Sequence, residues 1–263
     1  TGIPVRLSDA MELIDRTTDF IVSNQHLQLV DELTTSKRFK NIKLLNYVDE
    51  YDPDIQKQFA AMTYRLSLDT YLVVFRGTDD TLIGWKEDFH MTYMDHVPAQ
   101  KRAASYLQHV MKEFPKGHFL VAGHSKGGNL ATYACSYLPD SLFEQVDAIY
   151  SYDAPGLNKA IIETEGYQRT SPNIRRFVPQ GSIVGMMLEV PELTTIVKSR
   201  AFGGFAQHDA FTWEIKDYSF VTVSETSPDS QQTDLTLKQW VRETSAEERK
   251  KFFDTFFGIF LDA

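Results

Sequence analysis

Residues 118–128 read HFLVAGHSKGG, a short apolar run that ends in the pentapeptide GHSKG. A helical pattern follows at residues 129–137. The pentapeptide fits the G-x-S-x-G pattern of a nucleophile elbow, which needs a strand before it and a helix after it. Both lie on the correct sides here, so the sequence predicts that Ser125 is a catalytic nucleophile. The alternative is an ordinary Gly-rich connection between a strand and a helix, capped by a serine.

The neighbours of Ser125 suit such a turn. Side chains at Gly123 or Gly127 would collide with the strand and the helix that flank a strained turn. The helix that starts there directs backbone N–H groups at the site, which stabilises a developing oxyanion. We therefore expect the N–H of Lys126, the residue after the nucleophile, to be one donor of an oxyanion hole.

Length and charge limit the classes of protein to consider. The chain has 263 residues with ordinary apolar and charged content, which fits one α/β domain over residues 1–263. The net charge is −9, and no basic stripe stands out. Nucleic acid is therefore not expected as a partner, and neither is an anionic membrane surface.

The single cysteine, Cys135, lies in the apolar helix after the elbow. It cannot form an internal disulfide, so nothing requires an oxidising compartment, and we expect it to fill the core. No apolar run is long enough to span a bilayer, so no stable membrane insertion is expected. These features favour a cytoplasmic protein, although a leader removed before Thr1 stays an open alternative.

Strand and helix patterns alternate along the chain. Residues 59–66 and 70–76 flank a short polar turn and predict a hairpin, whose second strand is apolar throughout and should be central. Alternation of this kind predicts an α/β fold with a mostly parallel central sheet and helices on both faces. Further strands are predicted at residues 42–48, 146–152, 174–178, 194–198 and 218–223, and helices at residues 8–22, 98–114 and 158–165.

The C-terminal part of the chain is predicted as a loop followed by a helix. Residues 224–233 are polar and are interpreted as a loop. Ser245 and Glu248 fit a capping box that opens the last helix. Five phenylalanines between residues 252 and 260 then share one face of it, and packing onto the body is favoured over docking on a membrane.

A serine nucleophile needs a base, which is usually histidine. The fold that uses this elbow places its triad in the chain order serine, acid, histidine. Only one histidine, His208, follows Ser125, and it comes after several further strand patterns. We therefore predict His208 as the base, while His124 belongs to the elbow itself and is expected to point elsewhere.

The acid is predicted by the same order. Asp153 ends the strand after the elbow, and the carboxyl ends of such strands carry active sites. A later candidate region, residues 177–184, holds no carboxylate. Asp209 adjoins His208, and a neighbour in sequence rarely has the geometry to orient the imidazole. Asp153 is therefore the favoured acid.

The second oxyanion donor should come from the loop after an earlier central strand. Gly77 and Thr78 follow such a strand, and Thr78 could add its hydroxyl to its N–H. Taken alone, this segment would be interpreted as an ordinary turn rich in helix-capping residues.

Several motifs together carry a family resemblance: VFRGT at residues 74–78, Trp85, Asp88, GHSKGG at residues 123–128 and YDAPG at residues 152–156. From about residue 59 to residue 213 the chain resembles the class 3 (fungal-type) lipases of the α/β-hydrolase superfamily, and is closest to an uncharacterised bacterial lipase-like branch. The resemblance implies that Ser125 is the nucleophile, His208 the base, and Thr78 with Lys126 the oxyanion hole. Family lipases carry the acid after the strand that matches residues 174–178, where this chain has Gly181 and Ser182. Either Asp153 has taken over from a different strand end, or the triad is incomplete.

The sequence thus predicts a serine hydrolase that cleaves a carboxylic ester, of a small molecule or a lipid, through an acyl-enzyme. A catalytically degraded hydrolase fold acting as a binding or scaffold protein is one alternative, and a thioesterase or peptidase with the same triad is another. No cluster with metal-ligand spacing is present, so neither a metal nor a cofactor is expected.

Two segments near the predicted site could serve the substrate. Residues 202–205 place paired glycines between phenylalanines just before His208, which suits a hinge of a mobile gate. Met186, Met187 and Leu188 could line an acyl pocket. A tight turn and ordinary core packing are the respective alternatives.

Overall fold

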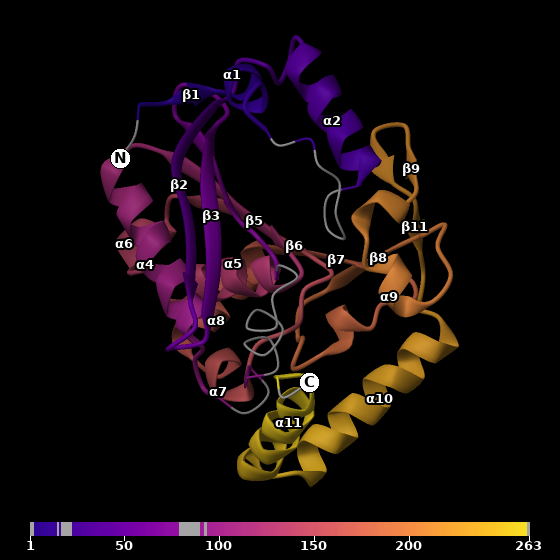
Figure 1. Cartoon of the computed structure of the whole chain (residues 1–263). Helices are drawn as coiled ribbons and strands as arrows, with labels where there is room; N and C mark the ends of the chain where they lie inside the picture. Colours follow the sequence, from indigo (N-terminus) through magenta and orange to yellow (C-terminus); the bar gives the residue numbers. More distant parts are fainter. Residues whose placement is uncertain (1–2, 15, 17–22, 79–89, 92–93, 262–263) are drawn as a thin grey trace.

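Nine strands form the central sheet of the computed structural model, counted over the residues that it describes: 3–14, 16, 23–78, 90–91 and 94–261 (Figure 1). Their order across the sheet is β1-β2-β3-β4-β5-β6-β7-β8-β11. The strands are β1 Val5–Arg6, β2 Lys43–Asp52, β3 Lys57–Arg65, β4 Thr70–Phe75, β5 His118–His124, β6 Val146–Tyr152, β7 Ile174–Pro179, β8 Thr194–Val197 and β11 Thr222–Val223. A separate two-stranded ribbon pairs β9 Ile215–Lys216 with β10 Ser219–Phe220.

The middle of the sheet is parallel and its margins are antiparallel. Strands β4 to β8 pair in parallel with their neighbours, whereas β1 to β4 and β8 with β11 pair antiparallel. The hairpin of β3 and β4 is confirmed, with Ala61 opposite Phe75 and Arg65 opposite Tyr71. Its second strand lies inside the sheet, as its apolar sequence predicts.

One face of the sheet carries the core. Side chains alternate along β4, so that Tyr71, Val73 and Phe75 are buried while the residues between them are half-buried. The helices α4 Pro98–Glu113 and α5 Lys126–Ser136 pack on this face. Every residue of α5 is buried, Cys135 included, and burial raises the pKa of its thiol. The expected role of Cys135 as core filler is confirmed.

The opposite face is less deeply covered, because its side chains, such as Leu72 and Leu120, are only half-buried. Helix α2, Asn24–Thr35, lies beside the chain segment that leads into β9 (Figure 1). There the His26 ring contacts the Phe211 ring at a centroid distance of 4.5 Å. The predicted α/β-hydrolase class is confirmed, with helices flanking a central sheet in which β4 to β8 are parallel.

A loop is predicted at residues 224–233, and for residues 228–233 this prediction is wrong. Helix α10 spans Pro228–Glu243. The hydroxyl of Ser227 caps it by accepting from Ser230 N–H at 3.3 Å, and Pro228 occupies its first turn. The segment is polar because little of the helix is buried.

Other boundaries differ more modestly from the prediction. The strand expected at residues 218–223 is divided between β10 and β11. Within the range 8–22 expected as a helix, the described residues form the short α1 Leu7–Met11, and residues 15 and 17–22 lie outside the described part. The remaining short helices are α6 Asp140–Phe143, α7 Lys159–Ile162, α8 Glu165–Thr170 and α9 Gly204–Gln207.

The last helix, α11 Ala246–Leu261, opens with the predicted capping box. Ser245 N–H donates to Glu248 Oε2 at 2.8 Å, and Glu248 N–H donates to Ser245 Oγ at 3.2 Å. Phe253 is buried and contacts the Trp240 ring of α10 at 5.8 Å. Helices α10 and α11 therefore form a helical hairpin, with contacts between their own aromatic side chains; the side chains after Thr255 lie outside the described part.

The parallel strands set the position of the site. Because their carboxyl ends meet at one edge of the sheet, the residues that follow them are brought together there. These residues are Gly77 and Thr78 after β4, Ser125 after β5, Asp153 after β6, Ser182 after β7 and, further along the chain after β8, His208.

Candidate active site

Ser125 has the strained backbone of a nucleophile elbow. Its φ is +57° and its ψ −134°, a conformation that a residue with a side chain rarely adopts. The turn is held by Ser125 N–H, which donates to Tyr152 O at 2.9 Å. A Cβ added at Gly123 would lie 2.1 Å from the carbonyl carbon of Gly127, and one at Gly127 would lie 2.1 Å from Phe75 O. The predicted collision with the following helix is confirmed for Gly123, whereas a side chain at Gly127 would collide with β4 rather than with a flanking element.

Gly77 brings the β4 loop against this elbow. A Cβ added there would lie 2.9 Å from His124 O and 3.3 Å from Ser125 Cβ. Thr78 is the next residue, and its role as an oxyanion donor stays a prediction. Asp80, Trp85 and Asp88 lie outside the described residues.

Lys126 is the first residue of α5, so its N–H belongs to the helix N-terminus beside Ser125. Its side chain is buried and runs toward β3, where Nζ donates to Gln58 O at 2.9 Å and to Gln58 Oε1 at 2.7 Å. The backbone of Lys126 can thus serve the oxyanion, while its ammonium group joins α5 to the sheet.

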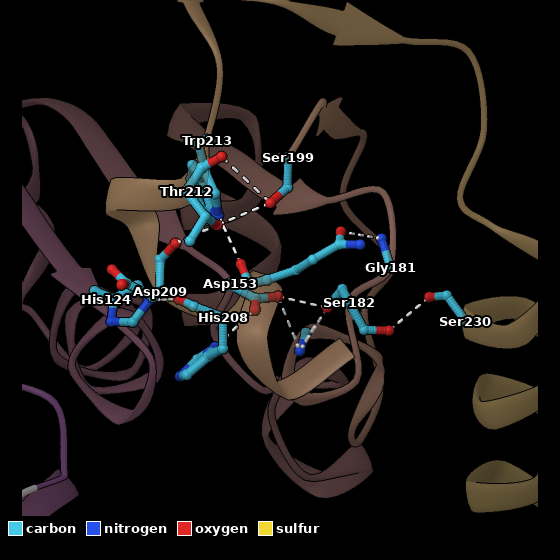
Figure 2. A network of polar contacts seen from close by, with 12 residues as sticks. His124, Asp153, Gly181, Ser182, Ser199, His208, Asp209, Thr212, Trp213 and Ser230 are labelled. Atoms are coloured by element: carbon cyan, nitrogen blue, oxygen red, sulfur yellow. Dashed lines mark hydrogen bonds and ion pairs between the residues drawn. The ribbon is translucent and has the colours of Figure 1, made fainter. Parts of the chain in front are cut away.

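The structure brings Asp153 and His208 into direct contact. Asp153 Oδ2 lies 2.7 Å from His208 Nδ1, and Asp153 is fully buried (Figure 2). Because a carboxylate oxygen accepts, Nδ1 carries the proton and Nε2 is the nitrogen able to accept one. Asp209, the other nearby acid, caps the following turn instead by accepting from Phe211 N–H at 2.9 Å.

The side chains of Ser125 and His208, both in the described part of the chain, form no hydrogen bond with each other. Such bonds are often long without substrate and tighten only in the complex. The chain does bring His208 to the elbow, since its ring lies 4.5 Å from that of His124.

The sequence predicted that His124 points away from the site, and this prediction is wrong. His124 lies against His208. Its Nε2 is 2.8 Å from His208 O, a carbonyl that can only accept, so Nε2 carries a proton. Burial and the nearby charge of His208 lower the pKa of His124 to about 4. His124 is therefore neutral at pH 7 and holds the backbone of the predicted base.

The other oxygen of Asp153 is held by the end of β7. Oδ1 accepts from Ser182 Oγ and, at 3.2 Å, from Gly185 N–H (Figure 2). The carbonyl of Ser182 in turn accepts from Ser230 Oγ of α10 at 2.5 Å. Sequence reasoning missed Ser182 as a partner of Asp153, although its place in the segment without a carboxylate was a signal; it had no signal for Ser230.

A second set of contacts fixes the chain just before His208. Gln207 Oε1 accepts from Gly181 N–H, and Gln207 O accepts from Trp213 Nε1, each at 2.8 Å. The segment before it is open: Gly203 has φ +83°, and the side chains of Phe202 and Phe205 are exposed. The gate at residues 202–205 stays a prediction.

Within the part of the chain that the structure describes, no group of three or more His, Cys, Asp or Glu side chains could hold a metal ion. Among the helices of these described residues, none is long and apolar enough to cross a membrane.

Comparison with known proteins gives a family and several similar structures. A lipase from Rhizopus microsporus var. chinensis is 18% identical over 64% of this chain and 72% of its own, with a TM-score of 0.48. Lipase II from Rhizopus niveus is 17% identical over 71% of this chain and 82% of its own, with a TM-score of 0.47. No curated protein matches the chain. Residues 33–258 match the Mbeg1-like family, and the chain belongs to that family.

Proposed function

We propose that this chain is a serine hydrolase that cleaves carboxylic esters through an acyl-enzyme. One observation carries the proposal: the 2.7 Å contact between buried Asp153 and Nδ1 of His208, beside a serine in the strained backbone of an elbow. A carboxylate in this position fixes the tautomer that leaves Nε2 as a base. The first alternative from the sequence, a catalytically degraded hydrolase fold acting as a binding or scaffold protein, would be favoured by a missing acid, and Asp153 argues against it.

The reaction assigns one role to each group. Nε2 of His208 takes the proton of Ser125 Oγ as this oxygen bonds to the ester carbonyl carbon. The carbonyl oxygen becomes an oxyanion, for which Thr78 and the N–H of Lys126 are the proposed donors. His208 then gives its proton to the alcohol oxygen as the C–O bond breaks.

Water completes the cycle by the same steps. His208 takes a proton from water as the water oxygen bonds to the acyl carbon. It then returns the proton to Ser125 Oγ as the bond between Ser125 Oγ and the acyl carbon breaks. The carboxylic acid leaves and the chain returns to its starting state. The side chain of Asp153 stabilises the imidazolium ion of His208 in both halves of the reaction.

Labelling by a fluorophosphonate probe, together with hydrolysis of nitrophenyl esters of rising chain length, tests the proposal. Wild type should be labelled and active, and Ser125→Ala should lose both while its circular dichroism spectrum is unchanged. Ser105→Ala, on the exposed side of α4, is the matched control and should behave as wild type. An unlabelled, inactive wild type would favour a binding protein, and a strong preference for thioesters or peptides would change the substrate class.

A further inference from the structure

A groove lies between the helical hairpin of α10 and α11 and the body of the chain. Its volume is about 520 Å³, within the range of roughly 300–1,000 Å³ of small-molecule sites. The body contributes residues 157–159 and 187–189. The hairpin contributes Leu237, Lys238, Trp240, Val241, Arg242, Arg249, Phe252 and Phe253.

The walls of the groove are apolar and incompletely covered. Leu237, Trp240 and Val241 are half-buried, and Phe252 is 54% exposed. Met187 and Leu188 face them from the body, where the sequence suggested an acyl pocket. The free energy falls when a ligand covers apolar surface that is otherwise in contact with water.

The rim of the groove is basic, although the chain as a whole is acidic. Lys159, Lys238, Arg242 and Arg249 line it, against a single acid, Glu189, in a chain of net charge −9. This charge complements an anionic head group attached to an apolar chain.

Arg242 is the rim cation that is available for such a head group. Lys159 pairs with Glu163 at 3.8 Å, and Lys238 with Asp234 at 2.7 Å. Arg242 is exposed and forms no ion pair with any residue that the structure describes. A guanidinium group matches the two oxygens of a carboxylate.

We propose that this groove binds a fatty carboxylate, with one acyl chain along its apolar walls and the carboxylate at Arg242. The groove is a site apart from the catalytic centre, and it stands whether or not Ser125 is a nucleophile. A fatty carboxylate is also the kind of product that a lipid esterase releases.

The groove is nonetheless built from the same loops as the candidate triad. Residues 154–158 follow Asp153 directly, and residues 186–189 follow Gly185, whose N–H donates to Asp153. The two segments pair through Gly156 N–H to Met187 O at 2.8 Å and through Leu157 with Glu189. The floor of the groove thus starts at the residues that hold the acid.

Calorimetric titration of Ser125→Ala with octanoate, decanoate and laurate, each below its micelle-forming concentration, tests the proposal. Each added methylene that is buried should tighten binding about fourfold, so successive acids should differ by roughly 16-fold. Arg242→Gln should weaken laurate binding by about tenfold or more, because it removes a charged hydrogen-bond donor. Arg6→Gln, at the exposed β1, is the matched control.

Specific results would overturn the proposal. These are equal affinity for all chain lengths, binding of dodecyltrimethylammonium as tight as that of laurate, or no effect of Arg242→Gln. Dodecyl phosphate binding more than about tenfold tighter than laurate would assign the groove to another ligand.

A partly exposed wall residue gives a second variant that should fold. Leu237→Gln should weaken laurate without changing the mass measured by light scattering. If the mass of Leu237→Gln differs from that of wild type and neither protein binds laurate, a second copy of the chain covers the groove instead. If wild type hydrolyses esters but Ser125→Ala does not bind laurate, only the proposed ligand of the groove is refuted. If Ser125→Ala binds laurate but wild type does not hydrolyse esters, only the proposed hydrolase activity is refuted.

Discussion

The ends of β6 and β7 lie next to each other at one edge of the sheet, yet they supply different chemistry to the same site. The β6 end supplies a carboxylate, Asp153, whose backbone is strained at φ +41°. The β7 end supplies donors, the hydroxyl of Ser182 and the N–H of Gly185, which both bind Asp153 Oδ1. By the family resemblance, the acid is expected on β7 rather than on β6.

If Asp153 is the acid, the edge of the sheet rather than one particular strand sets the position that a triad acid can take. Neighbouring strands are roughly 4.8 Å apart, so a carboxylate from either end can approach the same imidazole. A buried carboxylate also needs donors for the oxygen that the histidine does not use. Once Asp153 supplies the charge, a hydroxyl at residue 182 satisfies this need.

The largest expected effect concerns the β6 end. Asp153→Asn should lower the turnover number by about 10⁴, the effect of the same change in the serine-protease triad, because the amide favours the wrong tautomer of His208. Nitrophenyl ester hydrolysis measures this. The matched control is Asp147→Asn, which changes an exposed residue of the same strand. Turnover within tenfold of wild type in Asp153→Asn would remove Asp153 from the triad.

His124 lies against His208 and leads to a prediction about pH. The pKa of His124 is about 4 in the folded chain, below the ordinary 6.5, because burial and His208 disfavour its charge. The unfolded chain therefore binds more protons between these two values. The free energy of unfolding should fall as the pH drops from about 6.5 to 4, by on the order of 3 kcal/mol from this residue alone.

His124→Gln isolates this contribution, since an amide can still donate to His208 O but does not titrate. Urea unfolding at several pH values should give a shallower loss for the variant than for wild type in that window. Above pH 7 the difference between the two proteins should no longer change with pH. Parallel curves throughout would mean that His124 titrates normally.

Much of the fold and half of the site could be predicted because they follow repeating patterns. The apolar run of β5, the glycines of the elbow and the chain order of Ser125, Asp153 and His208 are local or ordered signals. They predicted the strand, the turn and the contact between Asp153 and His208 that the structure contains. The catalytic roles of these residues stay predictions.

The supporting residues could not be predicted, because their function depends on contacts between distant segments. A hydroxyl such as that of Ser182 carries no pattern that names its partner 29 residues away. The first turns of helix α10 were predicted as a loop because its exposed surface hides the apolar period, although Ser227 and Pro228 were a start signal. With α10 missing, neither Ser230 nor the groove at Arg242 could be foreseen.

Exchanging the two strand ends tests the comparison directly. Asp153→Ser should be nearly inactive, and combining it with Ser182→Asp should recover turnover by about tenfold, because a carboxylate returns to the same edge of the sheet. Recovery should be partial, since the hydrogen-bond donors that surround Asp153 are not placed to bind a carboxylate at residue 182. Asp153→Ser combined with Ser199→Asp, a buried serine elsewhere in the network, is the control and should recover nothing. An exchange variant that folds but stays as inactive as Asp153→Ser would show that only β6 can carry the acid.

The smallest effect separates the two roles of the β7 end. Ser230 is buried on α10, and its hydroxyl donates to the carbonyl of Ser182, whereas the hydroxyl of Ser182 donates to Asp153. Ser230→Ala should therefore lower the free energy of unfolding by about 1 kcal/mol, the typical value of one hydrogen bond, because it loosens α10 from the sheet. Turnover should stay within about threefold of wild type, since every donor to Asp153 remains. Ser224→Ala, at an exposed position before the helix, should change neither quantity. A hundredfold loss of turnover in Ser230→Ala at unchanged stability would mean that α10 controls the acid directly, and that the β7 end cannot be separated from the helix that holds it.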